Sequence, residues 1–186
     1  MSEIINLKKY FNNFSFKISS NNNTYKDLIK IKNLIINAKK NNSRVLIFGN
    51  GGSAAIASHV SVDLTKNSKV KAMNFNEADL ITCFSNDYGY DKWIDKTIEF
   101  YADKKDILIL ISSSGKSKNM INACKAAKKK KISKIITFTG NKKNNPLSKL
   151  GDINMWVDSN IYNHIENIHQ VWLLGICDLI KLNKVK

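Results

Sequence analysis

Five short runs of apolar, β-branched residues alternate along the chain with longer segments of helical pattern. The clearest run is DILILIS, and glycine or serine follows most of the others. Strands that alternate with helices form a parallel sheet covered by helices on both faces. The sequence therefore predicts an α/β fold, with strands at 44–49, 70–75, 106–112, 133–140 and 153–158.

Helical periodicity fills the segments between and around these strands. In the second of two N-terminal helices, Leu28, Ile31 and Ile35 recur at helical spacing. A length of 186 residues suits one domain, and neither an internal repeat nor a linker interrupts it. We expect a single domain over 1–186, in which the helical segment 1–41 packs on the α/β core. The expected helices are 3–18, 24–41, 53–66, 77–84, 91–102, one from the SSGKS turn to about 130, and 160–182.

The composition favours a globular protein of the cytoplasm. A hydrophobic share of 43% is enough for a full core, and no stretch approaches the roughly 20 apolar residues of a membrane span. The first residues lack the pattern of a signal peptide. We expect the three cysteines, Cys83, Cys124 and Cys177, to be free, buried thiols in a reducing compartment.

The net charge of +15 raises the question of nucleic-acid binding. Arg44 is the only arginine, however, and base readout and bidentate phosphate contacts favour arginine over lysine. Abundant Lys, Asn and Ile indicate the codon bias of an AT-rich genome. The run Lys128–Lys131 ends a helix, where cations suit the helix dipole. We therefore expect a solvated basic surface that attracts anionic substrates, without a specific nucleic-acid partner.

The first motif is Gly49-Asn50-Gly51-Gly52-Ser53, between a strand and a helix. Glycines allow a ligand to approach the backbone closely, and a helix N-terminus attracts anions. The alternative is a tight strand–helix turn without a ligand.

The second motif is Ser112-Ser113-Ser114-Gly115-Lys116-Ser117, again between a strand and a helix. Its hydroxyls and backbone amides suit a phosphate group, whereas the spacing of a Walker loop is absent. The alternative is helix N-capping, for which one serine is enough. Since both motifs follow parallel strands, they lie at the same edge of the sheet and can meet around one ligand.

FGNGGSAAIASH, SNDYGY and ISSSGKS occur in this order and at a spacing that resembles the sugar isomerase (SIS) family, in its phosphoheptose isomerase branch. The resemblance covers about 25–182. It implies a three-layer αβα sandwich with a five-stranded parallel sheet. It also implies a homotetramer with the N-terminal and C-terminal helices in its interfaces and active sites between subunits. The substrate-binding residues it implies are Asn50, Gly51, Gly52, Ser53, Asn86, Asp87, Ser112, Ser113, Ser114 and Ser117, with the serine loop holding a phosphate.

His59 and Asp63 lie four residues apart on one helix, so that both project from one face. This spacing suits a metal pair, an acid/base pair, or a surface hydrogen bond. In zinc-containing members of the family that the chain resembles, the matching positions hold His and Glu as metal ligands.

The last helix departs from the family pattern at two positions. Glu166 replaces a glutamine, and Leu174 replaces a histidine that binds zinc or transfers protons. Leucine can do neither. The remaining alternatives are zinc held by His59, Asp63 and Glu166, or a metal-free enzyme in which Glu166 or His169 does the acid/base work. His169 also suits a core or interface position.

The resemblance implies an aldose–ketose isomerase that acts through an enediol, with catalytic residues Asp63, Glu166 and His59. Glu166 or Asp63 would be the base, and His59 a polarising or metal-binding group. The implied substrate is sedoheptulose 7-phosphate, used for lipopolysaccharide or capsule heptose. The alternative is a non-catalytic relative that binds a sugar phosphate or a partner such as the replication initiator DnaA. Apolar residues in the first helix favour an oligomer, and the lack of a long apolar stretch favours no membrane partner.

Overall fold

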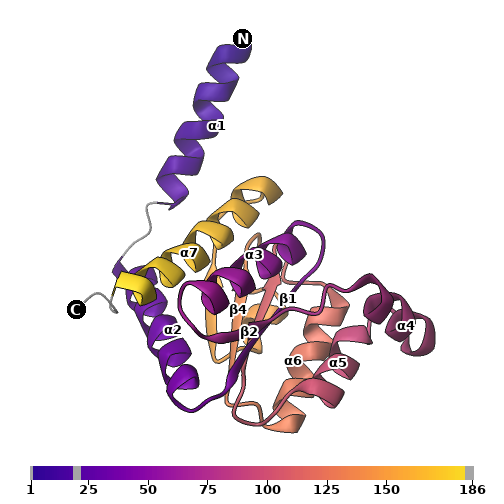
Figure 1. Ribbon diagram of the computed structural model, residues 1–186. Coiled ribbons are helices and arrows are strands. Elements are labelled where there is room, and N and C mark those ends of the chain that lie inside the picture. Colours follow the sequence, from indigo (N-terminus) through magenta and orange to yellow (C-terminus); the bar gives the residue numbers. More distant parts are fainter. Residues whose placement is uncertain (1, 19–21, 183–186) are drawn as a thin grey trace.

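A five-stranded parallel sheet runs through the centre of the computed structural model, which describes residues 2–18 and 22–182 (Figure 1). The strand order is β2-β1-β3-β4-β5, and every pairing is parallel. The predicted α/β architecture is confirmed. The strands are β1 (Arg44–Gly49), β2 (Lys71–Met73), β3 (Ile107–Ser112), β4 (Lys134–Thr139) and β5 (Ile153–Trp156).

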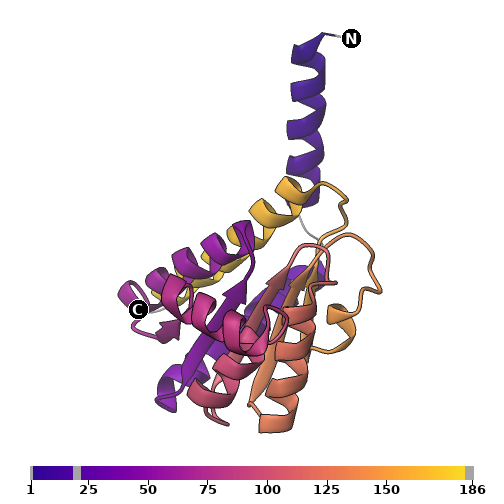
Figure 2. The same cartoon turned by 90° about the vertical axis from the view of Figure 1, so that its right-hand side faces the viewer.

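Helices cover both faces of the sheet, which gives the three layers visible in Figures 1 and 2. One face carries α2 (Asn22–Lys40), α3 (Gly52–Lys66) and α7 (Tyr162–Leu182). The other carries α5 (Trp93–Tyr101) and α6 (Lys118–Lys130). The remaining helices are α1 (Glu3–Ile18), α4 (Ala78–Tyr88) and the short η1 (Leu147–Lys149).

Alternation along the strands divides the core in two. In β1, Val45 and Ile47 pack with α2, α3 and α7, whereas Leu46 and Phe48 pack with α5 and α6. Successive strand residues point to opposite faces, so a strand buried on both sides is apolar throughout. This is why the strands are continuous apolar runs in the sequence.

The strand order fixes where a ligand can bind. The chain leaves β1 toward β2 on one side and continues from β3 toward β4 on the other. The loops that follow β1 and β3 therefore diverge, and they leave a crevice at the carboxyl ends of these two neighbouring strands. The glycine motif follows β1 and the serine motif follows β3, so the crevice lies between the two predicted motifs.

Two predicted element boundaries need correction. The strand expected at 70–75 is limited to Lys71–Met73, at the edge of the sheet. The helix expected at 77–84 continues to Tyr88, so most of the SNDYGY segment is helical and not a turn. The helix ends only at Gly89, whose φ of 89° favours glycine.

The N-terminal segment is divided between two environments. Ile31, Ile35 and Ala38 of α2 are buried against the sheet. In α1 no residue is buried; Phe14 and Ile18 pack against the apolar core, and the Tyr10 ring lies against His164 of α7. The rest of α1 projects from the body of the molecule, beyond the start of α7 (Figures 1 and 2).

The single arginine stabilises the sheet and is not on a free surface. Arg44 donates through Nε and Nη2 to the buried carboxylate of Asp106, the shortest distance being 2.7 Å. This carboxylate also accepts from the backbone N–H groups of Arg44 and Asp103, at 2.9 and 2.8 Å. The hydrogen bond to Asp106 raises the pKa of Arg44 further. The guanidinium of Arg44 is therefore occupied by contacts within its own chain.

None of the helices in 2–18 and 22–182 has the length and apolar character of a membrane span.

The cysteines differ from the expectation at one position. Cys124 and Cys177 are buried, but Cys83 is exposed on α4, because the outer face of this helix is uncovered. Burial raises the thiol pKa of Cys124 to about 11 and that of Cys177 to about 12. Both thiols are therefore protonated and inaccessible at neutral pH, whereas that of Cys83 is accessible.

We expect one thiol per folded chain to react with a chromogenic disulfide reagent at about pH 8, and all three after denaturation. The matched variant Cys83→Ser should then show no reactive thiol while folded. Rapid reaction of a second thiol in the folded wild type would contradict the buried positions of Cys124 and Cys177.

Candidate active site

The glycine motif forms a tight turn from β1 into α3. The amide of Ser53 donates to Asn50 O at 3.0 Å, and Gly51 has a φ of 53°. A side chain at Gly49 would collide with the backbone of Ser53, so the turn closes only with glycine there. Ser53 is buried beneath the turn, which leaves Asn50, Gly51 and Gly52 to line the crevice.

The serine motif joins β3 to α6. Ser112 and Ser113 are buried, and the Ser112 and Ser117 hydroxyls lie 3.1 Å apart. Ser114 Oγ accepts from the amide of Lys116 at 3.2 Å. Ser117 is the N-cap residue of α6, but its side chain makes no capping hydrogen bond. Helix capping therefore does not account for this serine, and its hydroxyl remains available to an anion at the helix N-terminus.

Glu166 of α7 lies between the two motifs. Ser113 Oγ donates to Glu166 Oε1 at 3.3 Å. The carboxylate also lies directly against Gly52, where a Cβ atom would collide with it. This position is the N-terminus of α3, whose dipole stabilises a negative charge. The half-buried carboxylate is thus held at the crevice by both motifs.

His59 is held by groups on two helices. Its Nε2 lies 3.8 Å from Asp63 Oδ2, one turn further along α3. Its Nδ1 lies 3.3 Å from Nε2 of Gln170 on α7. An amide nitrogen can only donate, so Nδ1 accepts and the ring proton is on Nε2, facing Asp63. The ring is half exposed and can act as a donor or a polarising group.

The helices α3 and α7 lie side by side and bring these groups into one row (Figures 1 and 2). Gly52 meets Glu166, and His59 meets Gln170 one turn along α7. Gly52 and His59 are about 10 Å apart along the α3 axis. One further turn of α7 reaches Leu174, which is half-buried and packs against the core. The row is therefore polar at Glu166 and Gln170, and apolar at Leu174.

The side chains of one chain do not make a zinc site. A catalytic zinc takes three protein ligands, and His59 with Asp63 supplies only two. Glu166 turns toward Gly52 and Ser113 instead. Within 2–18 and 22–182, no three His, Cys, Asp or Glu side chains gather closely enough to hold a metal ion.

The other histidines of α7 lie in apolar surroundings. His169 is completely buried, its Nε2 lies 3.1 Å from Thr139 O, and burial lowers its pKa to about 4. It is neutral and out of reach of a ligand, so the core interpretation is confirmed and an acid/base role is not. His164 is buried against the rings of Tyr10 and Phe14 of α1, and burial lowers its pKa too.

Asn86 and Asp87 lie in the last turn of α4. They are exposed on α4, where Asn86 Nδ2 donates to Asp87 Oδ1 at 3.0 Å. The segment that carries them continues to Tyr90, whose hydroxyl donates to Asn50 Oδ1 at 3.1 Å, so it reaches the glycine motif. The role of Asn86 and Asp87 in substrate binding stays a prediction.

Three residues of the site were missed by the sequence analysis. Gln170 contacts His59, while Asn119 and Tyr90 both contact Asn50. Spacing carried a signal for two of them, since Gln170 is one turn after Glu166 and Asn119 is two residues after Ser117. Tyr90 belongs to the SNDYGY motif, but local spacing does not predict its contact with Asn50, because the contact joins two loops.

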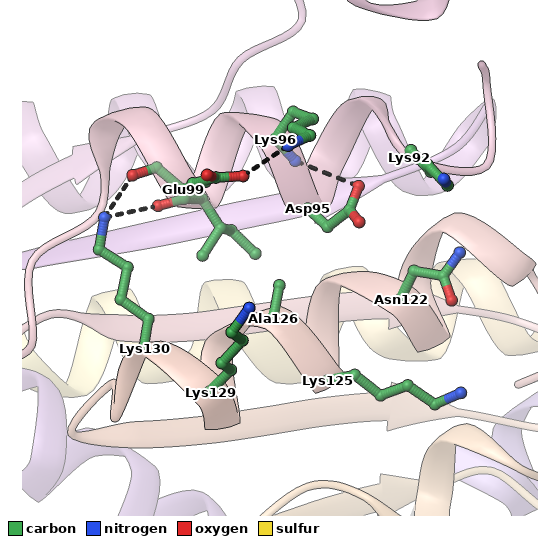
Figure 3. Close-up of a pocket in the computed structure, with 10 residues that line it drawn as sticks. Lys92, Asp95, Lys96, Glu99, Asn122, Lys125, Ala126, Lys129 and Lys130 are labelled. Carbon is green, nitrogen blue, oxygen red and sulfur yellow. Dashed lines mark hydrogen bonds and ion pairs between the residues drawn. The ribbon is translucent and has the colours of Figure 1, made fainter. Parts of the chain in front are cut away.

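A separate groove of about 750 Å³ lies between α5 and α6 (Figure 3). Lysines dominate its lining, but part of their charge is already used. Lys96 pairs with Glu99 at 2.8 Å, and Lys130 donates to the carbonyls of Ile98 and Glu99. The groove shares no residue with the row on α3 and α7, so it is a basic surface feature outside the candidate site.

The comparisons with known proteins agree with this arrangement. A family model described as the SIS domain matches residues 9–140. The phosphoheptose isomerase of Aliarcobacter butzleri is 36% identical over 159 residues, which is 82% of this chain and 83% of that protein. That of Helicobacter pylori is 32% identical over 154 residues, 80% of this chain and 79% of that protein.

Two solved structures of phosphoheptose isomerases have the same fold as this chain. The phosphoheptose isomerase of Neisseria gonorrhoeae superimposes with a TM-score of 0.88 at 25% identity, covering 96% of this chain and 99% of that one. That of Francisella tularensis shares the fold, with a TM-score of 0.88 at 24% identity over 98% and 100%. The resemblance inferred from the three sequence motifs is confirmed.

Proposed function

The chain belongs to the SIS-domain family, in its phosphoheptose isomerase branch, and from this premise we propose that it interconverts sedoheptulose 7-phosphate and D-glycero-D-manno-heptose 7-phosphate. The observation that supports this most is the position of Glu166, between the serine motif and the N-terminus of α3. A phosphate on the serines would place the sugar chain along this carboxylate.

The reaction moves one proton between neighbouring carbons. In our proposal the Glu166 carboxylate removes a proton from carbon 1 of the ketose. The electron pair of that C–H bond forms the double bond between carbons 1 and 2, the π pair of the carbonyl moves to the oxygen of carbon 2, and this oxygen takes up a proton to give the enediol. The hydroxyl of carbon 1 then loses its proton and becomes the aldehyde oxygen, while carbon 2 takes the proton back from Glu166. A positioned carboxylate suits this general acid–base step.

His59 supplies a hydrogen-bond donor for this chemistry. The N–H group at its Nε2 faces Asp63, and Gln170 Nε2 lies 3.3 Å from the other ring nitrogen. We assign His59 a polarising role and Asp63 the role of its charge partner. The donor set of one chain does not complete a zinc site, so we propose that the reaction proceeds without a resident metal.

We further propose that the enzyme is a homo-oligomer of the cytoplasm, with α1 in a subunit interface. Phe16 is 81% exposed, and Ile4, Leu7 and Phe11 are more than half exposed on the same projecting helix. Exposed apolar patches of this kind mark interaction surfaces. A second copy of the chain is the partner that the family assignment favours.

The test is turnover of sedoheptulose 7-phosphate by purified protein, with and without a chelator, together with its metal content. We expect turnover that the chelator leaves within about twofold, and less than about one tenth of a zinc ion per chain. Stoichiometric zinc with chelator-sensitive turnover would contradict the metal-free route. Metal-free protein that binds the sugar phosphate without converting it would contradict the isomerase function.

A further inference from the structure

We propose that Asn119 and Tyr90 are positioning residues that fix the side-chain amide of Asn50, so that it presents an N–H group to the reacting oxygens of the substrate. The inference rests on the proposed function and extends it to residues outside the predicted site. Asn50 lies two residues before Gly52, which contacts Glu166. Asn50 and Gly52 thus belong to the same turn, which borders the carboxylate that we propose as the base.

Asn50 and Asn119 form a reciprocal amide pair. Asn50 Nδ2 donates to Asn119 Oδ1 at 3.0 Å, and Asn119 Nδ2 donates to Asn50 Oδ1 at 2.9 Å. Asn119 is in the first turn of α6 and only 2% exposed. The pair connects the loop after β1 with the helix after β3, which are the two sides of the crevice.

The orientation of this pair is set by the backbone. On its own, a reciprocal amide pair could turn over as a unit and keep both hydrogen bonds. The backbone N–H of Met120, however, donates to Asn119 Oδ1 at 3.0 Å. This fixes the oxygen of Asn119, and therefore which end of Asn50 is the nitrogen.

The remaining bonding capacity of Asn50 follows from this orientation. Its oxygen accepts from Asn119 Nδ2 and from the Tyr90 hydroxyl at 3.1 Å, which uses both lone pairs. Its nitrogen carries two N–H groups, and within residues 2–18 and 22–182 only one of them has a hydrogen-bond acceptor, Asn119 Oδ1. Asn50 thus offers a ligand a donor and not an acceptor. A fixed donor suits the oxygen of an enediolate, where negative charge develops.

The first test is Asn119→Asp, which removes one donor only. The carboxylate still accepts from Met120 and from Asn50 Nδ2, but its second oxygen opposes Asn50 Oδ1. We expect kcat to fall about 100-fold with KM within about threefold, as for the loss of one oxyanion donor. Tyr90→Phe, at an exposed residue, should lower kcat about fivefold without affecting folding.

A double-mutant cycle separates positioning from added charge. In an Asn50→Ala background, Asn119→Asp should have no further effect, because its action passes through Asn50. Asn122→Asp, one turn along α6, adds the same charge and should leave kcat within about twofold. Equal effects of Asn119→Asp with and without Asn50 would overturn the inference, as would unchanged kcat in both Asn119→Asp and Tyr90→Phe.

Failure of the proposed function is recognised separately. It appears as absence of turnover in the wild type, before any variant is compared. The same cycle is then measured on the dissociation constant of sedoheptulose 7-phosphate by calorimetry. Non-additive losses at positions 50 and 119 support the positioning role, and additive losses overturn it.

Discussion

Glu166→Gln is expected to lower kcat for sedoheptulose 7-phosphate by about 1,000-fold, with KM within about threefold. An amide has nearly the shape of the carboxylate and still accepts the hydrogen bond from Ser113. It cannot remove a proton, so binding should survive while the chemical step is lost. The readout is steady-state kinetics, with exchange of the substrate's carbon-bound protons into deuterium oxide as a second measurement.

This substitution distinguishes two routes, because the family pattern implied by the resemblance has glutamine at this position. If the chain worked as a zinc enzyme with a damaged ligand set, Glu166→Gln would preserve or raise turnover. Glu99→Gln is the matched control, since Glu99 is exposed on α5 and contacts Lys96 only at the surface. Activity of Glu166→Gln above about one tenth of the wild type would exclude Glu166 as the base.

Asp106→Asn is expected to cost about 3 kcal/mol of unfolding free energy, the largest loss of stability that we predict. The Asp106 carboxylate is buried and accepts from Arg44 and from two backbone N–H groups. The amide introduced by Asp106→Asn cannot form the ion pair with Arg44, and its own N–H groups face the N–H donors that the carboxylate accepted from. Urea denaturation followed by circular dichroism measures the difference.

Asp103→Asn is the control for this prediction, because both carboxylates contact the same guanidinium. Asp103 is 80% exposed and lies 2.7 Å from Arg44 Nη2. Its loss should cost less than about 1 kcal/mol, since solvent screens an exposed pair. Asp106 precedes β3, at the end of the sheet away from the crevice. The Asp106→Asn variant should thus keep its kcat while it is folded, and equal losses of stability in both variants would contradict the role of burial.

The sequence was sufficient for the fold because the buried strands carry a nearly pure signal. The runs that became β1, β3 and β4 are buried almost throughout, since a strand between two helical layers has no exposed side to interrupt its pattern. Prediction was weakest at the edges of the molecule. In β2 only three residues pair, and α4 includes most of the polar SNDYGY segment, which the sequence analysis interpreted as a turn. Exposed helices and edge strands have less packing to define where they end.

The candidate site was predictable where local motifs define it, and not where helices meet. The turns after β1 and β3 carry their glycines and serines within a few residues, so Gly51 and Ser117 could be found from sequence. The contact of His59 with Gln170 joins two helices 111 residues apart in sequence. Only the packing of α3 on α7 determines that contact. The same packing turns Glu166 toward the crevice, which sequence spacing could not determine.

The position of α1 has a consequence for the folding of the protein during its synthesis on the ribosome. This helix is synthesised before the sheet, yet most of its apolar residues stay exposed in the structure of residues 2–18 and 22–182, even after the last strand has been made (Figure 2). Completion of the chain therefore does not complete its burial. If the homo-oligomer that we propose forms, Phe11 and Phe16 remain available to chaperones, or to a neighbouring nascent chain on the same messenger RNA, until a second folded copy binds. The rate at which active enzyme accumulates would then depend on how often ribosomes load that message.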